Sequence, residues 1–269
     1  MLEHRLRVAE VVVETGDAKS LVFERPAEFH YRPGQFLTLR VGEVARCYSL
    51  SSSPYTDDKP TVTVKRTPDG YASNWIHDNV VAGMELDVLP PGGVFSPATL
   101  DDDLVCCAAG SGITPVMSIV KSVLAAGSGN ITLIYANRDE NSIIFRETLT
   151  NLAAAHPTRL SVIHWLESVQ GLPTTPALRA LLEPFAVREA FVCGPVPFMD
   201  ATATALESLE APRIRVERFV SLVKNPWRRR TAQPAPAADK PAAVEVEMDG
   251  ERHAIKLPST SEKIVISHD

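Results

Sequence analysis

The chain has 269 residues, of which 45% are hydrophobic, and it carries a formal net charge of -6. This length suits two ordinary domains, and the negative charge gives no reason to expect nucleic-acid binding. No apolar run approaches the roughly 18 residues that a membrane-spanning helix needs, and residues 1–7 alternate in charge around no apolar core, so we expect neither a membrane anchor nor a secretory signal.

Cysteine usage points to a reducing compartment. The four cysteines, Cys47, Cys106, Cys107 and Cys193, have no paired spacing, and the adjacent pair is poorly placed for a disulfide. Their pattern predicts reduced thiols and a cytoplasmic protein.

The first hundred residues predict a small antiparallel barrel. Short runs rich in Val, Leu and Thr are separated by turn signals such as Thr15-Gly16-Asp17 and Pro91-Gly92-Gly93. The predicted strands cover residues 6–13, 20–25, 35–41, 44–50, 60–66 and 85–89. Six strands at this spacing favour a barrel, and residues 71–77 predict one short helix that opens after Gly70.

From about residue 101 the pattern changes to alternating strands and helices. The apolar run 104–108 predicts a strand buried on both faces, residues 110–114 a loop, and Pro115 the first turn of a helix that continues through Leu124. Further strands are predicted at 131–135, 160–165, 190–193 and 214–219, and further helices at 144–155, 176–182 and 197–209. This order predicts a parallel sheet with helices on both faces.

The C-terminal part reads as a linker followed by one hairpin. Residues 221–242 are rich in Pro and Ala and contain the basic run Arg228-Arg229-Arg230, which we interpret as a solvated patch. Residues 243–248 alternate apolar and polar, Asp249-Gly250 is a hairpin turn, and 254–257 is a returning strand. The predicted fold class is thus β followed by α/β, with domains at 1–99 and 100–220, the linker, and an incomplete β segment at 243–269.

Two side chains of one barrel strand suit a flavin nucleotide. Arg46 and Tyr48 are two residues apart and so point the same way. An arginine can pair with a phosphate, a tyrosine can lie on a flat ring, and Ser49 can hydrogen-bond that ring. The helix that opens at Gly70 offers free N–H groups to a phosphate. Equally, Tyr48 could be a core residue and Arg46 a surface charge.

Two glycine-containing turns follow predicted strands of the second half. Gly110-Ser111-Gly112-Ile113-Thr114-Pro115 lies between a strand and a helix, where such a loop can admit phosphates, although Pro115 stands in place of a third glycine. Cys193-Gly194-Pro195 ends another strand, at the edge where α/β sheets bind ligands. Each alone has a structural explanation, a tight turn and a buried cysteine.

Taken in order, these motifs resemble those of the ferredoxin–NADP reductase superfamily over residues 5–220. Within it, the chain is most similar to reductases that feed electrons to bacterial oxygenases, steroid oxygenases in particular. The motifs that carry the resemblance are Arg46-x-Tyr48-Ser49-Leu50, Gly70-x-x-Ser73, Gly110-Ser-Gly-Ile-Thr114-Pro115, Tyr135-x-Asn137-Arg138, Cys193-Gly194-Pro195 and Glu217-x-Phe219.

The resemblance implies a flavin-binding barrel and a nicotinamide-binding α/β domain, with a role for each motif. It places FAD on Arg46, Tyr48, Ser49, Leu50, Val64, Lys65, Gly70, Ala72 and Ser73. It places the nicotinamide coenzyme on Gly110, Gly112, Thr114, Pro115, Asn137, Arg138, Cys193, Gly194 and Pro195. It places catalysis at Tyr48, Ser49, Cys193, Glu217 and Phe219, with Phe219 near the flavin ring and also in contact with the cofactor.

The implied activity is an FAD-dependent NAD(P)H oxidoreductase that passes electrons through flavin to a terminal oxygenase or another acceptor. The closer resemblance favours NADH, although Arg138 could pair either with the 2′-phosphate of NADPH or with an acid of the sheet. The alternatives are a non-catalytic flavin-binding redox sensor or regulatory subunit, and an electron-transfer subunit of a larger dehydrogenase. No metal, nucleic acid or membrane partner is expected.

The chain departs from its relatives at the C-terminal segment. Oxygenase reductases of this kind carry a plant-type ferredoxin domain whose cluster is held by Cys-x4-Cys-x2-Cys and a distant fourth cysteine. Residues 243–257 resemble the opening hairpin of that domain, but residues 262–269 contain no cysteine. We therefore expect a truncated ferredoxin segment without a [2Fe–2S] cluster, and poor order over about the last forty residues.

Overall fold

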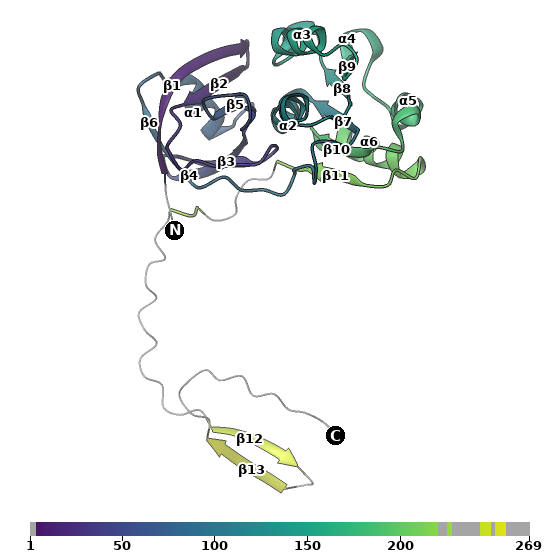
Figure 1. Ribbon diagram of the computed structural model, residues 1–269. Coiled ribbons are helices and arrows are strands. Elements are labelled where there is room, and N and C mark those ends of the chain that lie inside the picture. Colours follow the sequence, from purple (N-terminus) through teal and green to yellow (C-terminus); the bar gives the residue numbers. More distant parts are fainter. Residues whose placement is uncertain (1–3, 220–224, 228–242, 249–250, 257–269) are drawn as a thin grey trace. The chain divides into compact units, whose positions relative to one another are not determined.

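The computed structural model describes residues 4–219, 225–227, 243–248 and 251–256. The chain divides into two compact units, Met1–Trp227 and Arg228–Asp269 (Figure 1). Among the residues described, none of the helices combines the length and the apolar character needed to cross a membrane.

The N-terminal half of the first unit is the predicted antiparallel barrel. Its strands are β1 His4–Thr15, β2 Ala18–Phe23, β3 Phe36–Val41, β4 Val44–Ser49, β5 Thr61–Lys65 and β6 Glu85–Val88, in the order β4-β3-β6-β1-β2-β5. The long β1 pairs with β6 at its start and with β2 over the rest, with irregular register between, which bends the sheet. The two edge strands meet at a bridge between Leu50 and Val62, so the sheet closes there.

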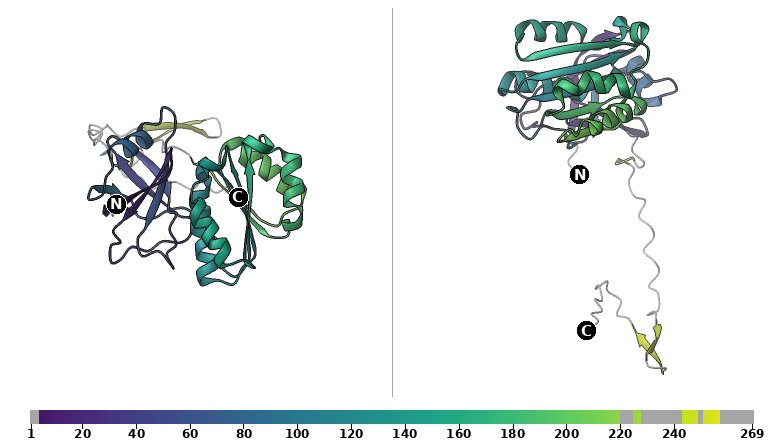
Figure 2. Two further views of the ribbon diagram at one scale, coloured as in Figure 1. Left: turned by 90° about the horizontal axis from the view of Figure 1, so that it is seen from above. Right: turned by 90° about the vertical axis from the view of Figure 1, so that its right-hand side faces the viewer.

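The C-terminal half of the first unit is the predicted parallel sheet. Its strands are β7 Leu104–Ala109, β8 Ile131–Asn137, β9 Leu160–Leu166, β10 Glu189–Cys193 and β11 Ile214–Glu217, in the order β11-β10-β7-β8-β9. One face is covered by α2 Ile113–Ala126 and α3 Arg146–Ala155, the other by α5 Thr175–Leu182 and α6 Val196–Ser208 (Figure 2). The barrel adds the short helix α1 Tyr71–Asn79.

The central strand β7 is buried on both faces of the sheet, and for this reason all of its residues are apolar. Leu104, Cys106 and Ala108 pack with α2 and α3, whereas Val105, Cys107 and Ala109 pack with α5 and α6. The adjacent cysteines therefore face opposite sides of the sheet, because successive strand side chains alternate. All four cysteines are free thiols, as predicted.

Three local features differ from the sequence-based expectation. Residues expected as a loop at 110–114 form the 3-10 turn Gly110–Gly112, after which α2 already begins at Ile113, so Thr114 lies in its first turn. A short helix, α4 Glu167–Gln170, and the 3-10 turns Glu140–Ser142 and Glu183–Phe185 were not predicted. These pieces are too short for helical periodicity to be read from sequence.

The second unit contains the antiparallel strands β12 Ala243–Met248 and β13 Glu251–Lys256. Met248 pairs directly with Glu251, so the returning strand begins earlier than the predicted start at Ala254. The Asp249-Gly250 turn, the basic run 228–230, Leu257 and residues 262–269 lie outside the described residues, as does most of the segment expected to be poorly ordered. The proposed domain limits stay predictions.

Replacing Gly34 with alanine should destabilise the first unit. Gly34 has φ +83°, and an added Cβ would overlap the Phe95 carbonyl and come within 3.3 Å of Ile119 Cδ1 on α2. A side chain in this left-handed conformation and crowded position should cost about 2 kcal/mol or more, measured by urea unfolding.

The matched control is Gly16→Ala, where nothing lies within 4 Å of the added Cβ. Its effect should stay within about 0.5 kcal/mol. Equal free energies of unfolding for the two variants would contradict the packing described for Gly34.

Candidate functional site

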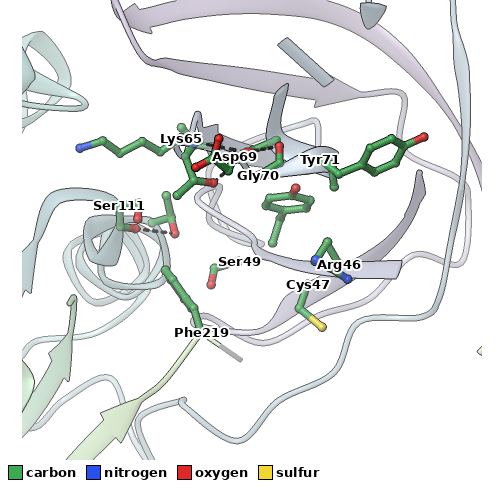
Figure 3. Close-up of a pocket in the computed structure, with 15 residues that line it drawn as sticks. Arg46, Cys47, Ser49, Lys65, Asp69, Gly70, Tyr71, Ser111 and Phe219 are labelled. Carbon is green, nitrogen blue, oxygen red and sulfur yellow. Dashed lines mark hydrogen bonds between the residues drawn. The ribbon is translucent and has the colours of Figure 1, made fainter. Parts of the chain in front are cut away.

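A cavity of about 450 Å³ opens where the barrel's edge strands β4 and β5 come together (Figure 3). Edge strands leave backbone N–H and C=O groups without a neighbouring strand, so such a seam can receive the polar edge of a ligand. The wall is completed by the first turn of α1, by the 3-10 turn and first turn at the start of α2, and by Phe219, two residues after β11. The lining residues are Arg46, Cys47, Tyr48, Ser49, Thr63, Lys65, Thr67, Asp69, Gly70, Tyr71, Ala72, Ser73, Ser111, Thr114 and Phe219.

Strand β4 gives this cavity both a cation and an aromatic ring. Arg46 and Tyr48 both line it, as their two-residue spacing predicts. Burial raises the pKa of the Tyr48 hydroxyl to about 12, so the side chain stays neutral at physiological pH. Arg46 Nη1 donates to the Ala45 carbonyl at 2.8 Å, which fixes the guanidinium beside the strand. The wall therefore has one flat neutral surface and one positive charge.

The N-terminus of α1 forms a polar cradle at the same cavity. Gly70 is its N-cap, and no side chain in the described part of the chain caps it. Thr67 Oγ1 and Ser73 Oγ lie 2.8 Å apart, and a Cβ on Gly70 would come within 2.5 Å of the first and 2.6 Å of the second. Glycine is therefore required here, and the first N–H groups of the helix are available to an anion.

A second cavity of about 370 Å³ adjoins the first, because Lys65, Ser111 and Phe219 line both. It lies at the carboxyl edge of the parallel sheet, beside the N-termini of α2 and α6. Gly110 makes the sharp turn out of β7 with φ +52°, and the Thr114 hydroxyl donates to the Ser111 carbonyl at 3.0 Å. The lining residues are Lys65, Ala109, Gly110, Ser111, Gly194, Pro195, Val196, Met199, Arg218 and Phe219.

Several predicted site residues lie behind these walls. Leu50 and Val64 belong to the barrel core, and the Val64 carbonyl contacts His77 Nε2 at 2.9 Å. Gly112, Pro115 and Cys193 are buried at the contact between α2 and β10. A Cβ on Gly112 would overlap the Cys193 carbonyl, so this glycine lets the helix approach the strand.

Glu217 links the two thiols nearest the cavities. Glu217 is the register partner of Cys193 in the parallel pairing of β10 and β11. Burial raises the pKa of Glu217 and, more strongly, that of Cys193, whose pKa the Glu217 charge raises further. The pKa of Cys47 is also raised, mainly by burial. Both thiols are therefore mainly protonated at neutral pH, which makes them weak nucleophiles there.

The end of β8 carries a buried amide and an exposed cation. Both polar atoms of the Asn137 side chain are buried and have no partner among the described residues. Such a group is costly unless a ligand satisfies it. Arg138 Nη2 lies 3.0 Å from Asp17 Oδ2, at the turn between β1 and β2. The acid that neutralises Arg138 thus comes from the barrel and not from the sheet.

Sequence reasoning missed about half of the lining. Strand periodicity could have found Thr63, two residues before Lys65, and Cys47, Ser111 and Arg218 stand inside quoted motifs. The other missed residues carry no sequence signal of their own, because only the folded chain brings them to the cavities: Thr67, Asp69, Tyr71, Ala109, Val196 and Met199.

Only one of the four thiols should react in the native protein. Cys47 is half-buried, whereas Cys106, Cys107 and Cys193 are fully buried. Because its pKa is raised, Cys47 should react slowly at neutral pH and faster as the pH rises and thiolate forms. A chromogenic disulfide reagent should count one thiol in buffer and four in denaturant.

Cys47→Ser is the control and should abolish the native reaction. Two or more reactive thiols in the folded chain would contradict the burial described for β7 and β10.

Comparison with known proteins agrees with this two-part site. Residues 5–96 match the oxidoreductase FAD-binding domain family and residues 106–204 the oxidoreductase NAD-binding domain family. The chain is 55% identical over 268 residues to the ferredoxin reductase component of 3-ketosteroid-9-alpha-monooxygenase from Rhodococcus rhodochrous, covering 94% of this chain and 76% of that protein. The corresponding protein of Mycolicibacterium smegmatis is 54% identical, with 98% and 79% covered.

A solved structure shares the fold. The Amycolatopsis cytochrome P450 reductase GcoB superposes with a TM-score of 0.71 at 23% identity, covering 81% of this chain and 70% of that one. At this identity the likeness concerns fold alone.

Together these findings favour electron transfer over a non-catalytic sensor. The barrel carries the FAD-binding domain and the parallel sheet the NAD-binding domain, and the relatives are reductases. The chain belongs to the ferredoxin reductase family and is an FAD- and NAD-binding oxidoreductase similar to the reductase components of oxygenases.

Proposed function

We propose that the chain takes electrons from NADH and delivers them through FAD to a separate acceptor in a steroid-oxygenase system. The observation that carries this is the junction of the two cavities at Lys65, Ser111 and Phe219. Two cofactors bound in adjoining cavities would meet there, one from the barrel side and one from the sheet side. Proximity and orientation are the main contributions that a protein makes to such a reaction.

The first cavity suits FAD. Arg46 can bind the pyrophosphate with paired donors, and the uncapped start of α1 at Gly70 supports a negative charge beside it. The neutral ring of Tyr48 and the Ser49 hydroxyl suit the flat ring system and its polar edge. The absence of a Cβ on Gly70 leaves room for this approach.

The second cavity suits the nicotinamide coenzyme. Gly110, Gly194 and Pro195 form walls without long side chains, and the N-termini of α2 and α6 favour phosphates. The buried Asn137 amide, which lacks a partner among the residues described, would gain one from the coenzyme's ribose. Phe219 lines both cavities, and buried Cys193 and half-buried Glu217 lie behind the wall next to it.

When bound, FAD accepts two electrons and a proton from NADH, leaves NAD⁺, and can release the electrons one at a time. The residues of the chain bring this about by holding the two rings together. Protonated Cys193 packs without charge at the sheet edge, and half-buried Glu217 can exchange a proton there, since its pKa is raised.

The proposed acceptor lies outside these 269 residues. The four cysteines do not have the Cys-x4-Cys-x2-Cys spacing of a plant-type cluster. These residues should therefore pass electrons from FAD to a ferredoxin-type [2Fe–2S] centre that their own four cysteines do not hold, and from there to a terminal oxygenase. The relatives' names support a steroid oxygenase, and four free thiols support a cytoplasmic location.

The deciding test is anaerobic reduction of the purified chain with one equivalent of NADH. The flavin absorbance should bleach fully, and no broad iron–sulfur absorbance should remain. Artificial dyes should then be reduced catalytically, while an oxygenase supplied with this chain as its one reductase component should not turn over.

Each step has an outcome that would contradict the proposal. If the purified chain holds no flavin, the assignment of Arg46, Tyr48 and Ser49 to FAD binding is wrong. Bound flavin that NADH and NADPH both leave oxidised would favour a sensor, and oxygenase turnover without an added ferredoxin would disprove the proposed separate acceptor.

Coenzyme choice follows from the partner of Arg138. Asp17 Oδ2 lies 3.0 Å from Arg138 Nη2 and 3.7 Å from Lys65 Nζ. Asp17 is held in turn, since Thr15 Oγ1 donates to its Oδ1 at 2.9 Å and Arg66 N to its carbonyl at 2.7 Å. A 2′-phosphate beside Arg138 would meet this carboxylate, which favours NADH.

Asp17→Asn should therefore shift selectivity toward NADPH. Removing the carboxylate frees two cations, and the ratio of kcat/KM for NADPH to that for NADH should rise about tenfold or more, as expected for one new charge-assisted contact. Dye-reduction kinetics with both coenzymes measure the ratio.

The double variant Asp17→Asn/Arg138→Gln tests the cause. It should lose the gain if Asp17 acts through Arg138. An unchanged ratio in the single variant would mean that the adenosine ribose binds away from this ion pair.

A further inference from the structure

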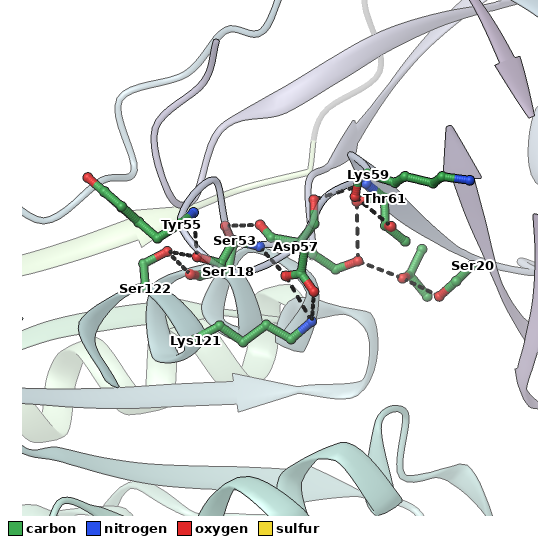
Figure 4. Close-up of polar contacts among 12 residues, drawn as sticks. Ser20, Ser53, Tyr55, Asp57, Lys59, Thr61, Ser118, Lys121 and Ser122 are labelled. Carbon is green, nitrogen blue, oxygen red and sulfur yellow. Dashed lines mark hydrogen bonds and ion pairs between the residues drawn. The ribbon is translucent and has the colours of Figure 1, made fainter. Parts of the chain in front are cut away.

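We infer that Ser118, Lys121 and Ser122 of α2 are positioning residues that set the distance between the two cofactor cavities. Together with Ser52, Ser53 and Asp57 of the loop after β4 they form a polar contact between helix and barrel, here called the serine clamp (Figure 4). The inference rests on the proposed function, because it concerns the rate at which flavin is reduced.

The serines of the clamp are buried but fully hydrogen-bonded. Ser53, Ser118 and Ser122 have 0% exposure and Ser52 has 1%. The Ser118 hydroxyl donates to the Ser52 carbonyl at 2.6 Å, which joins helix and loop directly. A buried polar contact of this kind tolerates few other geometries, because a hydroxyl displaced from its partner finds no water to replace it.

The donor and acceptor of each remaining hydrogen bond between the serines can be assigned. Ser122 Oγ donates to the Ser118 carbonyl at 2.6 Å, so its one proton is used. Ser53 Oγ, 2.8 Å away, must therefore be the donor to Ser122 Oγ, and Ser53 Oγ in turn accepts from Tyr55 N at 3.2 Å. Each hydroxyl has one proton to give, so the chain of bonds fixes the orientation of each serine.

An ion pair closes the outer side of the clamp. Lys121 Nζ lies 3.2 Å from both carboxylate oxygens of Asp57, and Asp57 Oδ2 also accepts from Ser53 N at 2.6 Å. The side chains of the pair are 21% and 31% exposed. The carboxylate thus orders the loop from within and ties it to the helix.

The clamp lies a few residues from both cavities. Ser52 follows Ser49 by three residues on the barrel side, and Ser118 follows Thr114 by one turn of α2 on the other. Ser49 and Thr114 line the first cavity, and Ser111, three residues before Thr114, lines both cavities. The bond from Ser118 to Ser52 is therefore a short brace between the flavin wall and the helix N-terminus.

A small displacement at this brace should matter for rate more than for affinity. Most of the first cavity's lining comes from the barrel and most of the second cavity's from the sheet, so FAD and NADH should still bind when the helix shifts slightly against the loop. The distance between the two rings would change, and a misplacement of about 1 Å can cost about 100-fold in rate.

The test combines Ser118→Ala with Ser122→Ala, and separately uses Lys121→Met. Stopped-flow reduction of the FAD-loaded chain over a range of NADH concentrations gives a limiting rate and an NADH Kd. We expect the limiting rate of the double variant to fall at least tenfold and that of Lys121→Met several-fold. The Kd values of NADH and FAD should stay within twofold of the unchanged chain.

A second readout does not depend on activity. Amide hydrogen exchange of the coenzyme-free variants should accelerate in residues 51–57 and 111–114 and stay unchanged in β8 and β9. Lys121→Arg, which keeps the charge, should restore the rate. Ser208→Ala removes a matched hydroxyl at the end of α6, which donates to the Ala205 carbonyl at 2.7 Å, and should change neither readout.

The outcomes separate the inference from the proposed function. Variant rates within twofold of the unchanged chain overturn the inference, as does a parallel loss of FAD affinity, NADH affinity and thermal stability, which would indicate general loosening. If the double variant does not fold, the Lys121 pair of variants decides alone. An unchanged chain that binds FAD but is not reduced overturns the proposed function itself.

Discussion

The packing of α2 against two different partners is the constraint on which the rest of the structure depends. Its apolar side, including Met117 and Val120, lies in the core beneath the parallel sheet. Its polar side, with Ser118 and Ser122, is equally buried but meets the barrel loop through hydrogen bonds. A helix enclosed in this way cannot move without breaking one contact, so its N-terminus at Ile113 has a fixed place between the two cavities.

The cavities obtain their positive character in two ways. Arg46 and Lys65 bring full charges, and the first turns of α1, α2 and α6 bring backbone N–H groups. Asp17 balances this arrangement by pairing with both Lys65 and Arg138. The chain has a net charge of -6, yet Arg46 and Lys65 bring positive charge to the cavities, partly offset by Asp69 in the lining of the first.

The contact between barrel and sheet has two unlike ends. At one end the serines of the clamp are buried, and their neutral hydrogen bonds depend little on salt. At the other, Asp17 meets Arg138, whose side chain is 63% exposed, so that ion pair is weakened by salt.

The sequence by itself determined the two fold classes and the approximate places of the strands and main helices along the chain, because periodicity and turn signals are local. It also predicted Arg46, Tyr48 and Gly70 as site residues, and all three line the first cavity. Only the tertiary structure decided that Cys193 and Val64 lie behind the walls, that Tyr71 and Thr67 belong to the lining, and that Asp17 reaches Arg138. Those facts depend on contacts between segments far apart in the chain. Strand register and helix packing create these contacts, and neither can be read from a single stretch of sequence.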